Sequence, residues 1–391
     1  MKERKAVVIG AGLGGLTAAA YLAKNGFDVN LFERHHTPGG YASSFVRGQY
    51  EFEVALHQLS GIGPEGDRGP CYRLLDRCDV ASRVEFLPIH DFYVSQFPDF
   101  RVKIPNGWEA AEEAYIRQFP EEREGIKRLL SLMRDIFREM QIMARASSTA
   151  GLLKLPFKGT HLIRSTGLTV SQALDREIKN PRLKALFCNV WGFYGLPLSK
   201  LSFTLFALGN ASYLEYGPYH IKGTSQALSN AFVDAIEENG GRVHLGNGIT
   251  KINVSDGRVT GVVDDRGEES PADHIVSNAN PIHCCLDLIG ADDVPSKYIK
   301  ALSEGHIGMS TFNAYLGLDC PAGELGLTDH EFFINDTYST EEQYESMTRI
   351  EKQKYWVITT YNATDPAFSP PGTTVLVVGE AELPGRAVKP Q

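Results

Sequence analysis

Several patterns that would point to a particular chemistry are absent from this chain of 391 residues. The six cysteines form no C-x-x-C pair and stand at no ligand spacing with histidine, so neither a metal site nor a disulfide framework is indicated. No G-x-S-x-G elbow, P-loop or metal-binding box is present, and the sequence assigns no catalytic residue. Reduced thiols in a cytosolic protein without a metal are therefore expected.

Positive charge and long apolar runs are also scarce. Lys and Arg number 39 against 48 Asp and Glu, which gives a formal net charge of -9 at pH 7. Such a chain has no electrostatic reason to bind nucleic acid. No run reaches the roughly 18 apolar residues of a membrane-spanning helix. A hydrophobic content of 42% over this length predicts a large core divided between about two domains.

Residues 6–40 have the order of a nucleotide-binding βαβ unit. A short apolar strand is followed by a G-x-G-x-x-G template, a helix rich in Ala and Leu, and a second strand. These parts are residues 6–9, the glycines Gly10, Gly12 and Gly15, the helix Leu13–Lys24, and residues 29–32. A glycine template alone is weak evidence, but all these parts in the right order predict a dinucleotide site.

The residue types of this unit suit a diphosphate. Gly10 permits the tight turn out of the strand, Gly12 lets the backbone approach a pyrophosphate, and Gly15 lets the helix pack closely on the sheet. The free N–H groups at the helix start, around Leu13 and Gly14, favour an anion because they lie at the positive end of the helix dipole. These five residues are therefore predicted to contribute to the cofactor site.

An acidic residue and a second glycine pair identify the dinucleotide. Glu33 follows the second strand about 20 residues after the glycines, where a ribose-binding carboxylate is expected. Glu33 with Gly39 and Gly40 resembles the E-x-x-x-x-x-G-G extension of FAD-binding oxidoreductases of the amine oxidase and phytoene desaturase superfamily. The resemblance implies FAD as the cofactor, with Arg34 beside the acid as a further contact. Many relatives have Arg after the glycine pair, whereas this chain has Tyr41, so that contact to the phosphates is not available.

Residues 45–63 carry a partial match to the same superfamily. In the phytoene desaturase, carotenoid isomerase and retinol saturase group, a segment of the form G-x-x-F-D-x-G-x-H runs across the flavin. Here Glu53 and Ala55 replace the usual Asp and Gly. The resemblance implies that His57, and Ser44 just before this segment, lie near the cofactor. A structural, hydrogen-bonded histidine is the alternative interpretation of His57.

Residues 184–228 resemble the carotenoid isomerase and retinol saturase group more specifically. The matching positions are Tyr194, Gly195, Pro197, Ser199, Ser202, Phe203, Tyr219, Gly223 and Leu228. Lys222 stands where a second glycine is usual, which implies a different backbone approach to the flavin. The many aromatic side chains of this stretch could line a tunnel for a flat polyene, and packing in a core is the equal alternative.

Later stretches extend both parts of the expected fold. Residues 242–263 are predicted to form two or three strands. The resemblance places the backbone of Ile249 against the adenine and identifies residues 272–281 as a return strand of the FAD domain. From about Cys284 onward, alternating patterns suit an antiparallel sheet.

The predicted fold class is α/β with an α+β insert, in which a discontinuous Rossmann-like FAD-binding domain joins a substrate-binding domain of antiparallel sheet plus helices. The FAD-binding domain is assigned residues 1–90 and 217–283, and the substrate-binding domain residues 91–216 and 284–391. Relatives continue past a strand like residues 373–378 into a segment that completes the FAD domain. We expect this C-terminal segment to be missing from the chain.

Residues 152–170 mix large apolar side chains with Lys and Arg. This stretch could rest on a membrane surface, where a lipid-soluble substrate would be collected. A core-packed segment with exposed lysines is the favoured interpretation. The expected location is cytoplasmic, with peripheral membrane contact as the alternative.

The resemblance implies an FAD-dependent oxidoreductase that acts on CH–CH groups of a hydrophobic polyene or isoprenoid. Hydride would pass between flavin N5 and the substrate, with desaturation, saturation and isomerisation all open. An amine or protoporphyrinogen oxidase and a truncated, non-catalytic flavin-binding protein are the alternatives. No second credible dinucleotide fingerprint occurs, so no separate NAD(P)H domain is expected, and the electron partner is left unassigned.

Overall fold

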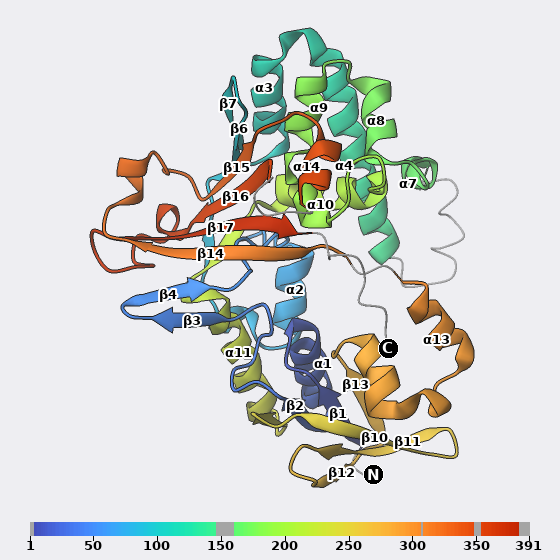
Figure 1. The fold of residues 1–391 in the computed structure, drawn as a ribbon. Helices are drawn as coiled ribbons and strands as arrows, with labels where there is room; N and C mark the ends of the chain where they lie inside the picture. The colour runs from blue at the N-terminus through green and yellow to red at the C-terminus, as the bar shows by residue number, and fades with distance from the viewer. Residues whose placement is uncertain (1–3, 146–159, 306–307, 348–352, 383–391) are drawn as a thin grey trace. The chain divides into compact units, whose positions relative to one another are not determined.

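The computed structural model describes residues 4–145, 160–305, 308–347 and 353–382 (Figure 1). Its contacts divide the chain into two compact units. Unit 1 comprises Met1–Leu59, Gly69–Leu87 and His220–His306, and unit 2 comprises Ser60–Arg68, Pro88–Tyr219 and Ile307–Gln391. A parallel sheet, several antiparallel sheets and many helices confirm the predicted α/β class.

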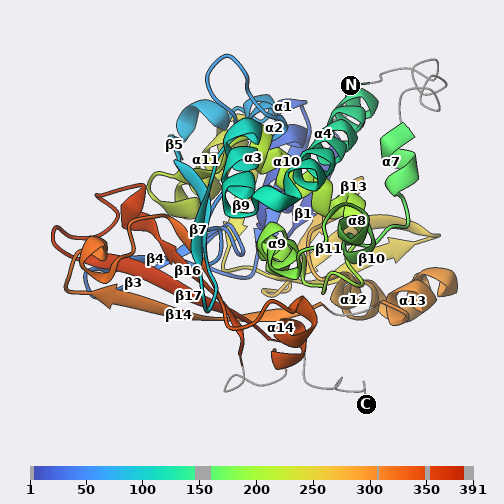
Figure 2. The ribbon, with the colours of Figure 1, turned by 90° about the horizontal axis from the view of Figure 1, so that it is seen from above.

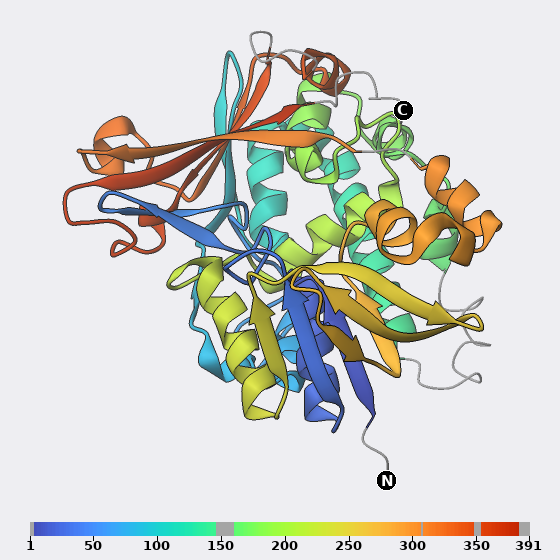
Figure 3. The ribbon, with the colours of Figure 1, turned by 60° about the horizontal axis from the view of Figure 1, so that its bottom comes forward.

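Unit 1 is built on a four-stranded parallel sheet, in which β1 and β2 are the central strands (Figure 3). In spatial order the strands are β13 (His274–Ser277), β1 (Lys5–Ile9), β2 (Asp28–Glu33) and β9 (Arg242–Leu245). The apolar run of β1 is buried because it has a neighbour on each side, with Val8 opposite Leu31 and Val276. Helix α1 (Leu13–Lys24) has its predicted bounds, and it packs beside α11 (Thr224–Glu238) against this sheet.

A second sheet of unit 1 is antiparallel and supports a short helical turn. Its strands are β10 (Ile249–Ser255), β11 (Arg258–Asp264) and β12 (Glu269–Pro271). After β13 the chain forms α12 (Pro281–His283) and a π-helical turn, η4 (Cys284–Gly290). Cys284 and Leu288 of this turn share a buried cluster with Ile252 and Val262 of the sheet. This packing explains why residues 284–306 group with unit 1, although the sequence assigned them to the substrate domain.

The remaining elements of unit 1 are a hairpin and short helices. They include β3 (Ser44–Arg47), β4 (Tyr50–Glu53), α2 (Pro70–Arg77), η1 (Ala81–Arg83), η5 (Ala291–Asp293) and α13 (Ser296–Ser303). Strands β5 (Phe86–Pro88) and β8 (Tyr219–Ile221) lie where the chain passes between the units. In the hairpin, Phe45 pairs with Phe52, and their rings stack.

Unit 2 is a six-stranded sheet covered by helices. In spatial order the strands are β14 (Ser310–Leu318), β17 (Thr374–Glu382), β16 (Tyr355–Thr360), β15 (Glu331–Asn335), β6 (Asp91–Gln96) and β7 (Arg101–Pro105). The helices are α3 (Trp108–Gln118), α4 (Arg123–Arg145), α7 (Thr160–Ser165), α8 (Val170–Glu177), α9 (Pro181–Phe187), α10 (Phe203–Tyr216) and α14 (Thr340–Ser346). Short helical turns lie between these strands and helices: η2 (Pro120–Glu122), η3 (Asn189–Tyr194), η6 (Ala322–Leu325) and η8 (Tyr361–Ala363).

The core of unit 2 lies between these helices and one face of the sheet. Helices α4 and α10 pack against each other (Figure 2). The aromatic residues that the sequence offered as tunnel or core include Trp191, Phe203 and Phe206, all of which are buried in this cluster. Phe333 of the sheet joins them. For these side chains the structure favours the core interpretation.

The structure bears on three further expectations. None of the helices in the described ranges combines the length and apolar character that crossing a bilayer requires. The six cysteines are all described and none forms a disulfide. Within the described residues, no group of three or more His, Cys, Asp or Glu side chains could hold a metal ion. Residues 152–159 of the basic apolar stretch 152–170, which could rest on a membrane, lie outside the described residues. In the described remainder, Leu162 and Val170 are buried in the core of unit 2.

Candidate functional site

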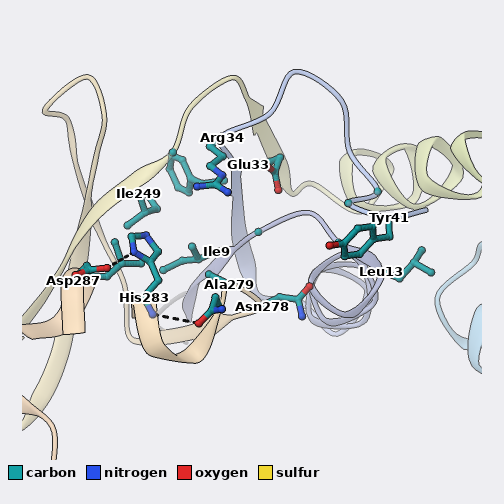
Figure 4. A pocket seen from close by; sticks show the side chains of 18 of the residues that line it. Ile9, Leu13, Glu33, Arg34, Tyr41, Ile249, Asn278, Ala279, His283 and Asp287 are labelled. Carbon is teal, nitrogen blue, oxygen red and sulfur yellow. Dashed lines mark hydrogen bonds and ion pairs between the residues drawn. The ribbon is translucent and has the colours of Figure 1, made fainter. Parts of the chain in front are cut away.

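A cavity of about 850 Å³ lies in unit 1, at the carboxyl ends of β1 and β2 (Figure 4). In open α/β sheets this edge is where ligands bind. The lining residues are Ile9, Gly10, Gly12, Leu13, Phe32, Glu33, Arg34, Gly39, Gly40, Tyr41, Ala42, Gly248, Ile249, Asn278, Ala279, Asn280, Ile282, His283, Asp287 and Leu288. Eight residues predicted for the cofactor site are among them: Gly10, Gly12, Leu13, Glu33, Arg34, Gly39, Gly40 and Ile249.

Two glycine segments meet at this cavity because the residues at their points of contact are glycines, which have no side chain. The Gly39 N–H donates to the Ala11 carbonyl at 2.7 Å, and Gly12 pairs with Gly39 in an isolated bridge. A Cβ on Gly40 would lie 3.3 Å from Gly12 Cα, and one on Gly39 would lie 2.1 Å from the carbonyl oxygen of Ala42. A larger residue at position 40 would push the two segments apart, and one at position 39 would clash with its own turn.

Helix α1 begins at the cavity with open backbone donors. Gly12 is the residue before its first turn, where no side chain of the described chain caps the N–H groups and no acidic residue occurs. The first N–H groups of a helix have no intrahelical partner, and the helix dipole is positive there. An anion such as a diphosphate would supply the missing acceptors.

Glu33 stands at the carboxyl end of β2 with both oxygens anchored by the backbone. Its Oε2 accepts from the Ala11 N–H at 2.7 Å, and its Oε1 accepts from the His35 N–H at 2.8 Å. An ionised carboxylate has about four lone-pair sites, so each oxygen keeps capacity for a further donor. The carboxylate is therefore held in place and still able to accept from a ribose hydroxyl in the cavity.

The end of the cavity away from Leu13 and Tyr41 combines apolar and polar groups (Figure 4). Ile249 and Arg34 contribute from the strand ends, and His283 and Asp287 contribute from the turn after β13. His283 Nδ1 and Asp287 Oδ2 are 2.6 Å apart. This end can therefore pack against a flat ring and also form hydrogen bonds with its edge.

Four predicted residues do not line the cavity: Gly14, Gly15, Ser44 and His57. Gly15 lies beneath it, because a Cβ there would be 1.9 Å from the Gly10 carbonyl oxygen, which accounts for the close packing of α1. The Ser44 hydroxyl donates to the carboxylate of Glu51 within the β3–β4 hairpin. The His57 N–H donates to the Ala55 carbonyl at 3.1 Å.

Sequence reasoning missed the contribution of the turn after β13. Asn278 follows β13 directly, and a Cβ on Gly12 would lie 2.9 Å from its Oδ1. Asp287 was not singled out, because residues from about Cys284 onward were assigned to the other domain, and no motif in the sequence pointed to His283. The sequence did carry a signal for the His283–Asp287 pair. The two residues are four positions apart and follow a helix start at Asn280-Pro281, and residues at i and i+4 share one face of a helical turn.

Glu53 is a buried carboxylate outside the cavity. It accepts from the Ser225 N–H at 2.7 Å and from the Ser225 hydroxyl. Burial raises the pKa of Glu53 to about 7, although the hydrogen bonds from Ser225 act in the opposite direction. Glu53, which replaces the Asp usual in relatives, therefore places its carboxylate at the start of α11. There it joins this helix to the β3–β4 hairpin.

The donor set of the cavity fits a dinucleotide. Backbone N–H groups surround the place for a diphosphate, and Glu33 supplies acceptors at the end of β2. The far end, with Ile249 and the His283–Asp287 pair, suits a heterocyclic base. Together these three regions match the adenosine diphosphate part of a dinucleotide.

Comparisons with known proteins agree with this geometry. The chain is 24% identical over 378 residues to the 4,4'-diapophytoene desaturase (4,4'-diapolycopene-forming) of Methylomonas sp, covering 95% of this chain and 72% of that one. It is 26% identical over 383 residues to the all-trans-retinol 13,14-reductase of Danio rerio, covering 90% of this chain but only 61% of that one. An oxidoreductase structure from Methanosarcina mazei superposes with a TM-score of 0.68 at 18% identity, covering 97% and 79% of the two chains, which shows a shared fold.

The family model described as flavin containing amine oxidoreductase matches residues 13–384. This match includes both units, so it does not depend on the dinucleotide fingerprint alone. The chain belongs to the flavin-containing amine oxidoreductase family.

Proposed function

We propose that this protein is an FAD-dependent oxidoreductase that acts on CH–CH groups of a hydrophobic polyene or isoprenoid. Family membership indicates the flavin, and the cavity of unit 1 has donors and acceptors for the adenosine diphosphate part of FAD. The observation that carries the substrate class is the set of relatives, which are named as phytoene desaturases, prolycopene isomerases and retinol reductases. Desaturation, saturation and isomerisation all stay open.

The residues of the chain would bind and orient the cofactor. Backbone N–H groups at the start of α1 would hold the diphosphate, and Glu33 would accept from the ribose hydroxyls. Bound FAD supplies hydride transfer at its N5 atom. Because this chemistry belongs to the cofactor, it is compatible with a sequence that shows no catalytic triad.

One face of the sheet in unit 2 suits an apolar substrate. Register places Ala314, Val378 and Ile358 in one row across β14, β17 and β16. On the same face of β14, the side chains of Phe312 and Leu316 are 49% and 41% exposed. The opposite face of the sheet is occupied by the core beneath the helices. We therefore assign the binding of the hydrocarbon to unit 2.

The test begins with the cofactor. The full chain is purified, and flavin absorbance per chain is compared with that of Gly12→Val, whose side chain would enter the space held by Asn278 Oδ1, 2.9 Å from the Cβ position. Gly323→Val is the matched control, because a Cβ at Gly323 meets nothing within 4 Å. A yellow Gly12→Val protein would argue against this site.

The substrate class is tested on the holoprotein. Phytoene and retinol are offered in detergent, with putrescine as the amine comparison, and both the flavin spectrum and the products are followed. Conversion of a polyene supports the proposal. Conversion of the amine alone would overturn the substrate class while leaving the cofactor assignment intact.

A further inference from the structure

The turn after β13 is anchored at both ends. At its start, the Asn280 side-chain oxygen accepts from the N–H groups of Ile282 at 2.9 Å and His283 at 3.4 Å. Further along, Cys284 and Leu288 are buried in the core of unit 1. The side chains of this turn that line the cavity are therefore positioned by their own backbone before any ligand arrives.

His283 and Asp287 form a hydrogen-bonded pair on this turn (Figure 4). A carboxylate offers only acceptors, so the 2.6 Å contact to Asp287 Oδ2 places the ring hydrogen on His283 Nδ1. In a neutral imidazole the other nitrogen, Nε2, is then an acceptor. No donor in the described part of the chain bonds to Nε2. With a neutral imidazole, the pair thus presents one unpaired acceptor at the cavity.

The position of this acceptor along the cavity points to the base. If the diphosphate lies at Gly12 and the ribose at Glu33, the base falls beside Ile249, Arg34 and His283. Adenine carries an amino donor on the carbon where hypoxanthine and guanine carry an oxygen acceptor. An acceptor fixed at that position would favour adenine and disfavour the other two purines.

We propose that His283, with its tautomer set by Asp287, is the residue that selects adenine in the bound dinucleotide, by accepting a hydrogen bond from the adenine amino group. The proposal rests on the proposed function only in that FAD occupies the cavity of unit 1. The amino group has two hydrogens, so this contact leaves one for a second acceptor. Asp287 acts as a positioning residue, since its carboxylate accepts from His283 Nδ1 and thereby sets the tautomer.

The experiment is a calorimetric titration of the flavin-free full chain with ADP and with IDP, which differ in the substituent at the six-position of the base and in the hydrogen on the neighbouring N1. The wild-type chain is expected to prefer ADP. His283→Ala should lower ADP affinity by about three- to tenfold, the value of one hydrogen bond, and leave IDP affinity unchanged. Asp287→Asn, whose amide donates as well as accepts, should give an intermediate ratio of ADP to IDP affinity. His283→Gln keeps a side-chain acceptor and should retain part of the preference.

His274→Ala is the matched control, because His274 is an exposed histidine of β13 outside the cavity. The His274→Ala chain should keep the wild-type ratio of ADP to IDP affinity. Equal ADP preference in wild type and His283→Ala, with both folded by circular dichroism, overturns the selection role but not the cofactor assignment. A wild-type chain that binds neither ADP nor FAD overturns both. If His283→Ala does not fold, Asp287→Asn decides. An Asp287→Asn chain with the same ratio of ADP to IDP affinity as the wild type overturns the role of the pair.

Discussion

Glu53 and Glu331 are carboxyl groups that the folded state holds away from water. Burial raises the pKa of Glu331 to about 8 and that of Glu53 to about 7. Glu53 receives two hydrogen bonds from Ser225, whereas neither oxygen of Glu331 has a partner among the described residues. A buried acid without a partner is stable only when protonated, so Glu331 should make folding depend on pH, and Glu53 should add a smaller contribution of the same sign.

The Glu331→Gln substitution tests whether the buried Glu331 carboxyl group makes stability depend on pH. Between the unfolded pKa of 4.5 and the folded pKa of about 8, the folded state keeps a proton that the unfolded state has lost. The free energy of unfolding should therefore fall as pH rises through this window, by up to about 1.4 kcal/mol per pH unit. Glu331→Gln cannot titrate, so its unfolding free energy should decline less with pH. The difference in slope should be clearest between these two pKa values and should disappear well above the folded one.

Urea denaturation across the same pH window is the measurement. Glu237→Gln, an exposed change on α11, serves as the control and should follow the wild type. Parallel curves for wild type and Glu331→Gln would mean that Glu331 is ionised in the folded state, contrary to its burial.

A second residue-scale prediction concerns the ribose. Glu33→Ala removes a charged acceptor that the backbone holds in position, and FAD binding should weaken by about 1.5–3 kcal/mol. The dissociation constant of FAD is measured by titrating the flavin-free protein, with Glu237→Ala as the control. An unchanged constant would remove Glu33 from the site.

At the scale of elements, the β3–β4 hairpin is attached to the start of α11. The Ser225 N–H and hydroxyl both donate to Glu53, and the Thr224 hydroxyl donates to Glu51 at 3.4 Å. Thr224 begins the helix with a φ of +66°, a backbone conformation that non-glycine residues adopt at a cost. These contacts hold the strained helix start in place.

Ser225→Ala is expected to loosen this attachment. The change removes a hydrogen bond to a buried carboxyl group, and the free energy of unfolding should fall by about 1–3 kcal/mol at neutral pH. Ser296→Ala, at an exposed position at the start of α13, is the comparison and should have little effect. If the two variants unfold at the same denaturant concentration, the hairpin is held by other contacts.

The packing of α1 on its strand gives a second prediction at this scale. In Gly15→Ala the new Cβ would lie 1.9 Å from the Gly10 carbonyl oxygen, so the helix must move away from the turn. Overpacking of this kind typically costs about 1–3 kcal/mol, and here it should also weaken FAD binding. Thermal melting with and without FAD measures both effects. Gly323→Ala, which has open space around it, should melt like the wild type.

At the scale of the whole molecule, cofactor binding should stabilise unit 1 through segments distant in sequence. At a hundredfold excess over the dissociation constant, a ligand adds about 2.7 kcal/mol to the stability of the state that binds it. Hydrogen exchange with and without FAD should show added protection at the glycine turn and also at residues 278–288. Protection limited to the glycine turn would mean that the turn after β13 does not contact the cofactor.

Much of unit 1 could be predicted because its signals are local. The strand, glycines and helix of the βαβ unit follow from apolar periodicity and turn chemistry, and α1 has its predicted bounds. Residue spacing likewise predicted Glu33, and the resemblance of the E-x-x-x-x-x-G-G extension predicted Gly39; both line the cavity. The boundary near Cys284 differed from the observed units because the packing of η4 on β10 is a long-range contact.

The sequence by itself determined the dinucleotide fingerprint, the α/β class and the family, because each depends on residues close together in the chain or on an overall pattern. Only the tertiary structure decided that residues 278–288 form a wall of the same cavity, more than two hundred positions after the glycines. It also decided which carboxyl groups are buried, since Glu53 and Glu331 look like ordinary strand residues in the sequence. Their surroundings come from distant segments, and sequence periodicity carries no information about which segments those are.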